Sequence, residues 1–183
     1  MKKQFLGILS IFFLFSGCIS DSENTLSRFE RELERIEEYL RNNDIVSVKE
    51  LSDPTRGIYM FWQEESGSGI LPFEGDTAFV DYTGRLLTNS IFDTSIEQVA
   101  RDNNIFNPQR EYNPLDVLMG FRRVILGFEF GIFQMEVGDK ATIIFPSLFG
   151  YGDNPRAGDL RNQPLIFEID LLELRSNRFD EEL

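Results

Sequence analysis

Residues 75–95, which read GDTAFVDYTGRLLTNSIFDTS, carry the strongest structural signal in the chain. From residue 77 to residue 87 the side chains alternate between two faces, as in a half-buried strand. The apolar face carries Ala78, Val80 and Tyr82, and the other face begins at Asp81. The segment therefore predicts a β-strand with one side against a core.

Other stretches complete a sheet. Residues 58–62 alternate like a half-buried strand, and residues 140–145 and 165–174 also read as strands. Residues 65–75 are rich in Gly and Pro and predict a loop. Residues 125–135 place Phe128, Ile132 and Met135 at steps of four and three, the spacing of a short helix on a sheet. We expect an α+β domain with an antiparallel sheet and one helix on its face.

The N-terminus has the features of an export signal. Lys2 and Lys3 precede an apolar run over residues 5–15, which is shorter than the roughly 20 residues of a spanning helix. Ser16 and Gly17 then precede Cys18, and small residues before a cysteine resemble the lipobox of bacterial lipoproteins. This resemblance predicts a signal peptide over residues 1–17 and lipidation of Cys18. The alternative is a plain signal peptide or an uncleaved anchor.

Lipidation implies a location in the cell envelope. Several acyl chains on Cys18 would give stable membrane attachment without a spanning helix. The expected site is the outer membrane, with the protein facing the periplasm. The single cysteine of the chain leaves none for an intramolecular disulfide.

Residues 18–56 predict a tether followed by an amphipathic helix. Apolar residues recur at steps of three and four along one helical face: Leu26, Phe29, Leu33, Ile36 and Leu40. Packing of this stripe on the chain's own domain is the favoured interpretation, and a dimer through helix 26–40 is the alternative. Residues 46–56 are expected to form a linker, and residues 176–183 an acidic tail.

The charge balance limits the partners. The chain has 31 acidic and 18 basic residues, a formal net charge of -13, and no histidine. Such an acidic surface repels phosphate backbones, so no nucleic-acid partner is expected. The lack of histidine removes the commonest metal ligand and general base. We expect no metal and no cofactor.

Two ordered blocks of sequence resemble the FKBP-type peptidyl-prolyl isomerases. The first is the opening stretch, with its Gly-Asp, Tyr-Thr-Gly and Phe-Asp-Thr-Ser elements. The second begins as VILGFEFGIFQMEVGDK at residues 124–140 and continues through PSLFGYG at 146–152 to PLIFEIDL at 164–171. The resemblance implies a domain over residues 57–175, in which the sheet half wraps around the short helix and a pocket binds proline.

The resemblance also assigns site residues. It implies a catalytic pocket formed by Tyr82, Phe92, Asp93, Ile125, Phe128, Tyr151 and Phe167. It implies further substrate contacts from Leu115, Val124 and Leu160. Rotating an amide breaks no covalent bond, so the pocket needs no nucleophile; the backbone N–H of Ile125 and the hydroxyl of Tyr151 can hold the flanking carbonyls.

Three departures from the family pattern lie around this pocket. Phe128 stands where the family's pocket floor has tryptophan, and Asp159-Leu160-Arg161-Asn162 replaces an Ile-Pro-Pro stretch. The connection over residues 96–113 is longer than usual. Its first residues predict a helical turn or two, and we expect the segment to act as a flap beside Phe92 and Asp93.

The resulting hypothesis is a peptidyl-prolyl cis-trans isomerase that acts on proline-containing segments of exported proteins, with chaperone activity from the apolar pocket. Two alternatives belong to other classes. One is a module that binds peptides without turnover. The other is a lipoprotein scaffold of an envelope machine, of the gliding-motility type.

Overall fold

A computed structural model describes residues 25–176 of the 183-residue chain. The predicted signal peptide at residues 1–17, the predicted lipidation site Cys18, the start of the tether and residues 177–183 of the predicted tail lie outside the described residues. Within the described range, no helix is both long enough and apolar enough to cross a bilayer.

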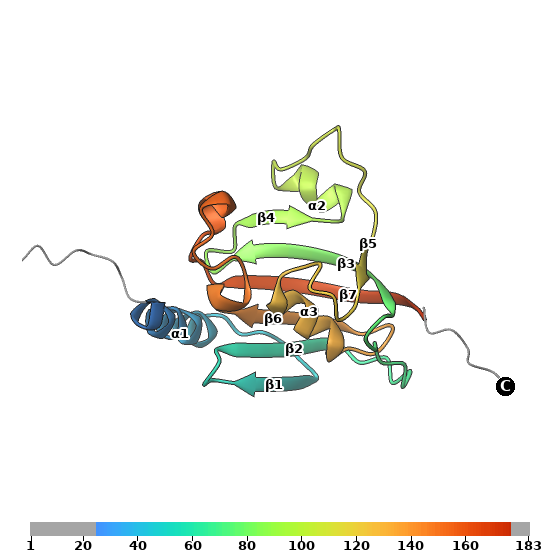
Figure 1. The fold of residues 1–183 in the computed structure, drawn as a ribbon, viewed down its shortest axis with the longest axis horizontal. Coiled ribbons are helices and arrows are strands. Elements are labelled where there is room, and N and C mark those ends of the chain that lie inside the picture. Colours follow the sequence, from blue (N-terminus) through green and yellow to red (C-terminus); the bar gives the residue numbers. More distant parts are fainter. Residues whose placement is uncertain (1–24, 177–183) are drawn as a thin grey trace, which may run out of the picture.

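The described residues form one mixed sheet-and-helix unit (Figure 1). The strands are β1 (Lys49–Asp53), β2 (Ile58–Glu64), β3 (Thr77–Leu86), β4 (Ile91–Thr94), β5 (Leu115–Leu118), β6 (Lys140–Phe145) and β7 (Leu165–Arg175). The α-helices are α1 (Thr25–Asn42), α2 (Glu97–Asp102) and α3 (Leu126–Phe133). Two 3₁₀ helices cover Ser147–Phe149 and Pro155–Leu160.

Every strand pair in the sheet is antiparallel. The order is β1-β2-β6-β7-β3-β4, and β5 also pairs with β3. β3 pairs along its whole length with β7, whereas β5 and β4 share its other edge, with β5 beside the first half and β4 beside the second. This register places Asp93 of β4 opposite Gly84 of β3.

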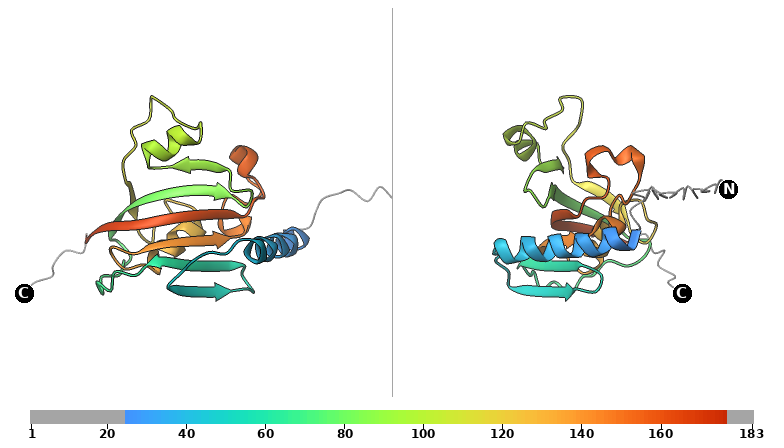
Figure 2. Two further views of the ribbon diagram at one scale, coloured as in Figure 1. Left: turned by 180° about the vertical axis from the view of Figure 1, so that it is seen from behind. Right: turned by 90° about the vertical axis from the view of Figure 1, so that its left-hand side faces the viewer.

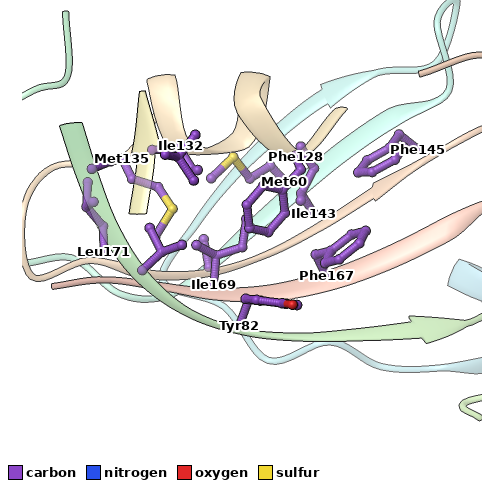
Figure 3. Packing of buried hydrophobic residues seen from close by; sticks show 14 of the residues in the cluster. Met60, Tyr82, Phe128, Ile132, Met135, Ile143, Phe145, Phe167, Ile169 and Leu171 are labelled. Atoms are coloured by element: carbon purple, nitrogen blue, oxygen red, sulfur yellow. The ribbon is translucent and has the colours of Figure 1, made fainter. Parts of the chain in front are cut away.

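Strand alternation divides the apolar side chains between two faces. On one face Met60, Ile143 and Phe167 join the main core, which α3 covers (Figure 3). On the other face their neighbours Tyr59, Phe61, Ile144 and Ile166 pack against Ile36 and Tyr39 of α1. The unit therefore has three layers, with the sheet between α3 and α1. The predicted α+β sheet half wrapped around one short helix is confirmed.

The close approach of α3 to the sheet depends on two glycines. A Cβ at Gly127 would lie 2.5 Å from the ring of Phe145, and a Cβ at Gly131 would lie 3.2 Å from Ile143. Contacts below 3.0 Å between such atoms are not tolerated without movement. The glycines thus let the helix backbone rest directly on β6, and the bulkier Phe128 and Ile132 fill the space beside it.

Helix α1 packs on the domain of its own chain, as the favoured interpretation predicted. Ile36 is fully buried, and Glu32 and Tyr39 are buried with it. Figure 2 shows the helix lying alongside the sheet, next to β2. The middle of the predicted apolar stripe thus packs against the sheet of the same chain. The alternative of a dimer through helix 26–40 stays a prediction.

Two sequence-based expectations need correction. Residues 46–56, predicted as a linker, contain the edge strand β1, which pairs with β2 from Lys49 opposite Trp62 to Asp53 opposite Ile58. Strand 58–62, predicted as half-buried, is buried on both sides. The reason is that α1 covers the face that an isolated domain would leave in water. The loop at residues 65–75 and the other predicted strands are confirmed.

Candidate active site

A cavity of about 400 Å³ opens between β3, β4, the start of β5 and the N-terminal end of α3. It brings together nearly all the residues that the family resemblance assigned to the pocket: Tyr82, Phe92, Asp93, Leu115, Val124, Ile125, Phe128, Tyr151 and Phe167. The exception is Leu160, which packs on the edge of the core and does not line the cavity.

Aromatic rings form the inner wall of the cavity. Phe128 and Phe167 meet edge to face with their centroids 5.0 Å apart, and Tyr82 meets Phe128 in the same way at 5.6 Å (Figure 3). Phe92 meets Phe167 edge to face at 5.6 Å. Edge-to-face rings interlock and resist rotation. The cavity is therefore a firm apolar surface, with the buried Phe128 at the position predicted for the pocket floor.

The backbone of β3 leaves room for these rings at one residue. A Cβ at Gly84 would lie 2.7 Å from the ring of Phe92 and 2.8 Å from the ring of Phe167. Any side chain at this position would displace one of the two rings. The glycine of the Tyr-Thr-Gly element thus leaves room for two rings that line the cavity.

Among the described residues, one carboxylate lines the cavity, and both of its oxygens accept hydrogen bonds. The Tyr82 hydroxyl donates to Asp93 Oδ2 at 2.7 Å, and the Thr94 backbone N–H donates to Asp93 Oδ1 at 2.9 Å. The guanidinium of Arg110 forms an ion pair with Asp93 and donates to the Tyr82 hydroxyl at 3.1 Å. This network fixes the side chains of Tyr82 and Asp93 and neutralises the carboxylate.

Burial and this network set the protonation states. Burial, followed by the hydrogen bond to Asp93, raises the pKa of Tyr82 to about 12. Burial, followed by the charge of Asp93, also raises the pKa of Tyr151. The hydrogen bond to Asp93 raises the pKa of Arg110. Both phenols thus carry their protons at neutral pH, so each hydroxyl can donate a hydrogen bond.

Two donors at the rim are free of partners within the described residues. The backbone N–H of Ile125, at the start of α3, and the hydroxyl of Tyr151 make no hydrogen bond within residues 25–176. Tyr151 lies within a tight turn in which the Ser147 carbonyl oxygen accepts from the Gly150 backbone N–H at 2.9 Å and from the Gly152 backbone N–H at 2.8 Å. The site therefore offers two positioned donors beside an apolar wall.

The insertion at residues 96–113 folds as a compact arm next to β4. It contains α2, as predicted, and then a stacked pair, Phe106 and Tyr112, with centroids 5.6 Å apart. The Arg101 guanidinium lies over the Phe106 ring at 3.5 Å. The arm reaches the site through Arg110, so its position beside Phe92 and Asp93 agrees with the expectation; a flap motion stays a prediction.

Sequence reasoning missed three arginines at the site. Arg122 and Arg123 line the cavity, and Arg110 bonds two residues that line it. Arg122 and Arg123 directly precede the predicted rim residue Val124, and this adjacency was an available signal. Arg110 lies 17 residues after Asp93 within the insertion, and no spacing rule connects the two. Among residues 25–176 no group of three or more metal-ligating side chains is present.

Comparison with known proteins places the chain in a family. A family model described as FKBP-type peptidyl-prolyl cis-trans isomerase matches residues 70–172. The chain is 41% identical over 96 residues to a short-type peptidyl-prolyl cis-trans isomerase of Methanocaldococcus jannaschii; the match covers 52% of this chain and 56% of the relative. It is 34% identical over 110 residues to FK506-binding protein 1 of Aspergillus oryzae, covering 59% of this chain and 90% of that protein.

Solved structures agree with these matches. A peptidyl-prolyl cis-trans isomerase of Pseudomonas syringae superposes with a TM-score of 0.58 and 28% identity, covering 84% of this chain and 97% of that one. FkpA of Escherichia coli has the same fold, with a TM-score of 0.59 and 23% identity over 83% of this chain and 63% of that one. The chain belongs to the family of FKBP-type peptidyl-prolyl cis-trans isomerases.

Proposed function

We propose that this chain catalyses cis-trans isomerisation of X-Pro amide bonds in proline-containing segments of exported proteins. The observation that carries the proposal is the apolar cavity with two free donors at its rim, Ile125 N–H and Tyr151 hydroxyl. A proline ring fits the aromatic wall, and the donors can hold the carbonyls that flank it. The named relatives of the same family support this reading.

The physical task matches this arrangement. An X-Pro amide rotates over a barrier of roughly 18–20 kcal/mol because resonance keeps the bond planar. The twisted transition state loses that resonance and is less polar than the planar amide. A dry apolar wall destabilises the planar, solvated amide relative to the twisted one, and the two donors fix the chain on both sides. No proton is transferred.

Asp93 and Tyr82 act as a rigid polar wall in this proposal. Their hydrogen bond at 2.7 Å and the ion pair of Asp93 with Arg110 hold both side chains in place. The Asp93 carboxylate therefore contributes a fixed field beside the rotating carbonyl. Rotation needs no general base, which is consistent with a chain that has no histidine.

A tetrapeptide assay tests the proposal. Cis-to-trans conversion of an Ala-Xaa-Pro-Phe substrate is followed in the presence of the chain, and we expect catalysis. Phe167→Ala removes a cavity wall and Tyr151→Phe removes a rim donor; each should lower kcat/KM, on the order of tenfold for Phe167. Phe79 lies outside the cavity, under the Arg175 guanidinium at 4.7 Å. Phe79→Leu is therefore the matched control and should leave kcat/KM unchanged.

The outcomes separate two functions. Peptide binding, measured by titration calorimetry, without any acceleration of isomerisation would refute catalysis and leave a peptide-binding module. We also propose that the same cavity holds unfolded segments and so gives chaperone activity. Suppressed aggregation of a proline-free unfolded protein, lost in Phe167→Ala, is the expected result for that activity.

We propose an envelope location, with attachment through acyl chains on Cys18 at the outer membrane. The support is the sequence alone: a basic start, an apolar run too short to span a bilayer, and Ser16-Gly17 before the only cysteine. Labelling with radioactive palmitate should mark the wild-type protein and not Cys18→Ala. Equal labelling of both would exclude lipidation at this residue.

A further inference from the structure

The charge at the proposed pocket is opposite to the charge of the chain. The chain carries 31 acidic and 18 basic residues, yet two of the charged residues that line the cavity are Arg122 and Arg123. The remaining charged lining residue, Asp93, is neutralised by its ion pair with Arg110. The mouth of the cavity is therefore a positive site on an acidic molecule.

Within residues 25–176, neither of these two arginines has an acidic partner. Other arginines of the described residues form ion pairs at the exposed surface. Arg41 pairs with Glu37, and Arg101 pairs with Glu97. Neither Arg122 nor Arg123 lies within 4.0 Å of a carboxylate oxygen in residues 25–176. Their guanidinium groups are exposed and available to a ligand in the cavity.

A buried carboxylate fixes the turn that carries them. Glu129 of α3 is buried, and its Oε1 accepts from the backbone N–H of Gly120 at 2.9 Å and of Arg122 at 3.3 Å. Arg122 has a φ of 51°, a left-handed conformation that a non-glycine residue adopts only where its surroundings impose it. Because Glu129 binds backbone groups, it does not occupy the guanidinium groups.

We propose that this site prefers substrates with an acidic residue next to the proline, and that Arg122 and Arg123 determine this preference. The inference rests on the proposed isomerase function. Arg122 and Arg123 line the cavity together with Val124 and Ile125, the residues that the family resemblance assigns to the rim beside the proline. A carboxylate there meets two unpaired positive charges, whereas a lysine ammonium meets repulsion.

The size of the effect follows from exposure. Because both arginines are in contact with water, the attraction is moderate and depends on salt. At low ionic strength we expect kcat/KM for the glutamate peptide to be on the order of ten times the kcat/KM for the lysine peptide. The value for the glutamine peptide should lie between these two. The ratio should shrink toward one in 1 M salt.

The experiment compares three tetrapeptides, Ala-Glu-Pro-Phe, Ala-Gln-Pro-Phe and Ala-Lys-Pro-Phe, on the wild-type chain and on R122E/R123E. The variant should reverse the order, with the lysine peptide converted faster than the glutamate peptide. R41E/R175E, which makes the same change in net charge on residues outside the cavity, should keep the wild-type order. Far-UV circular dichroism and thermal midpoints confirm that each variant folds.

Each outcome bears on a different claim. Lack of catalysis with all three peptides would refute the proposed isomerase and is distinct from failure of this inference. Catalysis with equal kcat/KM for the glutamate and lysine peptides would overturn the acidic preference. A preference that persists in R122E/R123E would overturn its assignment to these two arginines.

Discussion

The most direct structural prediction concerns Glu32, a buried carboxylate that connects α1 to the loop before Tyr151. Glu32 is 2% exposed, and its two oxygens accept from the Ser147 backbone N–H at 2.6 Å and from the Ser147 hydroxyl at 2.7 Å. Ser147 opens the 3₁₀ helix Ser147–Phe149, and its carbonyl oxygen accepts the two hydrogen bonds of the turn that contains Tyr151. We expect Glu32→Ala to destabilise the fold and to loosen this loop.

The magnitude follows from the two hydrogen bonds. Each hydrogen bond to a charged group is worth roughly 1.5–3 kcal/mol, and a buried backbone N–H left without a partner costs a further 1–3 kcal/mol. The burial cost of the carboxylate, which the alanine variant no longer pays, offsets part of this sum. We expect a net loss of about 3 kcal/mol in the free energy of unfolding. Glu32→Gln keeps one acceptor oxygen and should lose about half as much.

Urea unfolding measures this loss. Trp62 is the only tryptophan and is buried, so its fluorescence reports the transition. Glu30→Ala, on the exposed side of the same helix, is the control and should change the free energy by less than about 0.5 kcal/mol. A loss of less than about 1 kcal/mol in the free energy of unfolding of Glu32→Ala would refute this expectation. The cost of burying the carboxylate would then offset the free energy of its two hydrogen bonds. The KM for the tetrapeptide should rise in Glu32→Ala and not in Glu30→Ala.

Three other predictions concern the cavity and the helix behind it. Gly84→Val should displace the ring of Phe92 or Phe167 and lower kcat/KM on the order of tenfold, measured in the tetrapeptide assay; unchanged activity would show that the wall can move. Gly127→Ala should push α3 from Phe145 and lower the free energy of unfolding by about 1–3 kcal/mol in urea; a stabilised variant would contradict the close approach. The Tyr82 phenol has a pKa of about 12, above its unfolded value of 10, so its contribution to stability is complete below pH 10 and is lost as the pH rises toward 12. Absorbance at 295 nm should therefore show a late-titrating phenol that is absent in Tyr82→Phe, and identical titrations would contradict this.

Sequence patterns predicted the parts of the fold that alternate in polarity. Strands β3, β6 and β7 and helix α3 were all predicted, although β6 is buried on both faces, with Ile143 in the main core and Ile144 against α1. Strand β1 was missed because its sequence, KELSD, has a single apolar residue, and the strand exists through backbone pairing with β2. Burial of Tyr59 and Phe61 was missed for a related reason: the element that covers them, α1, lies far from them in sequence.

The site was predictable where its residues lie on these elements. Tyr82, Phe128 and Phe167 share the core-facing sides of β3, α3 and β7, so the fold alone brings them together. The contact of Arg110 with Asp93 depends on how the insertion folds, through the stack of Phe106 on Tyr112 and not through any periodic pattern. The electrostatic character of the pocket therefore rests on loop residues, whereas its shape rests on regular elements.

The part of the chain that matches the family is smaller than the part that holds the site in place. The family model begins at residue 70, yet α1 is bonded at two points to the β6–β7 connection, which carries Tyr151: Glu32 binds Ser147, and Arg35 donates to the Gln163 side chain at 3.0 Å. The same helix buries Ile36 against β6 and β7. If Cys18 is the anchor, only a short tether separates the membrane from a helix that is bonded to the loop carrying Tyr151. The helix is therefore a structural part of the site.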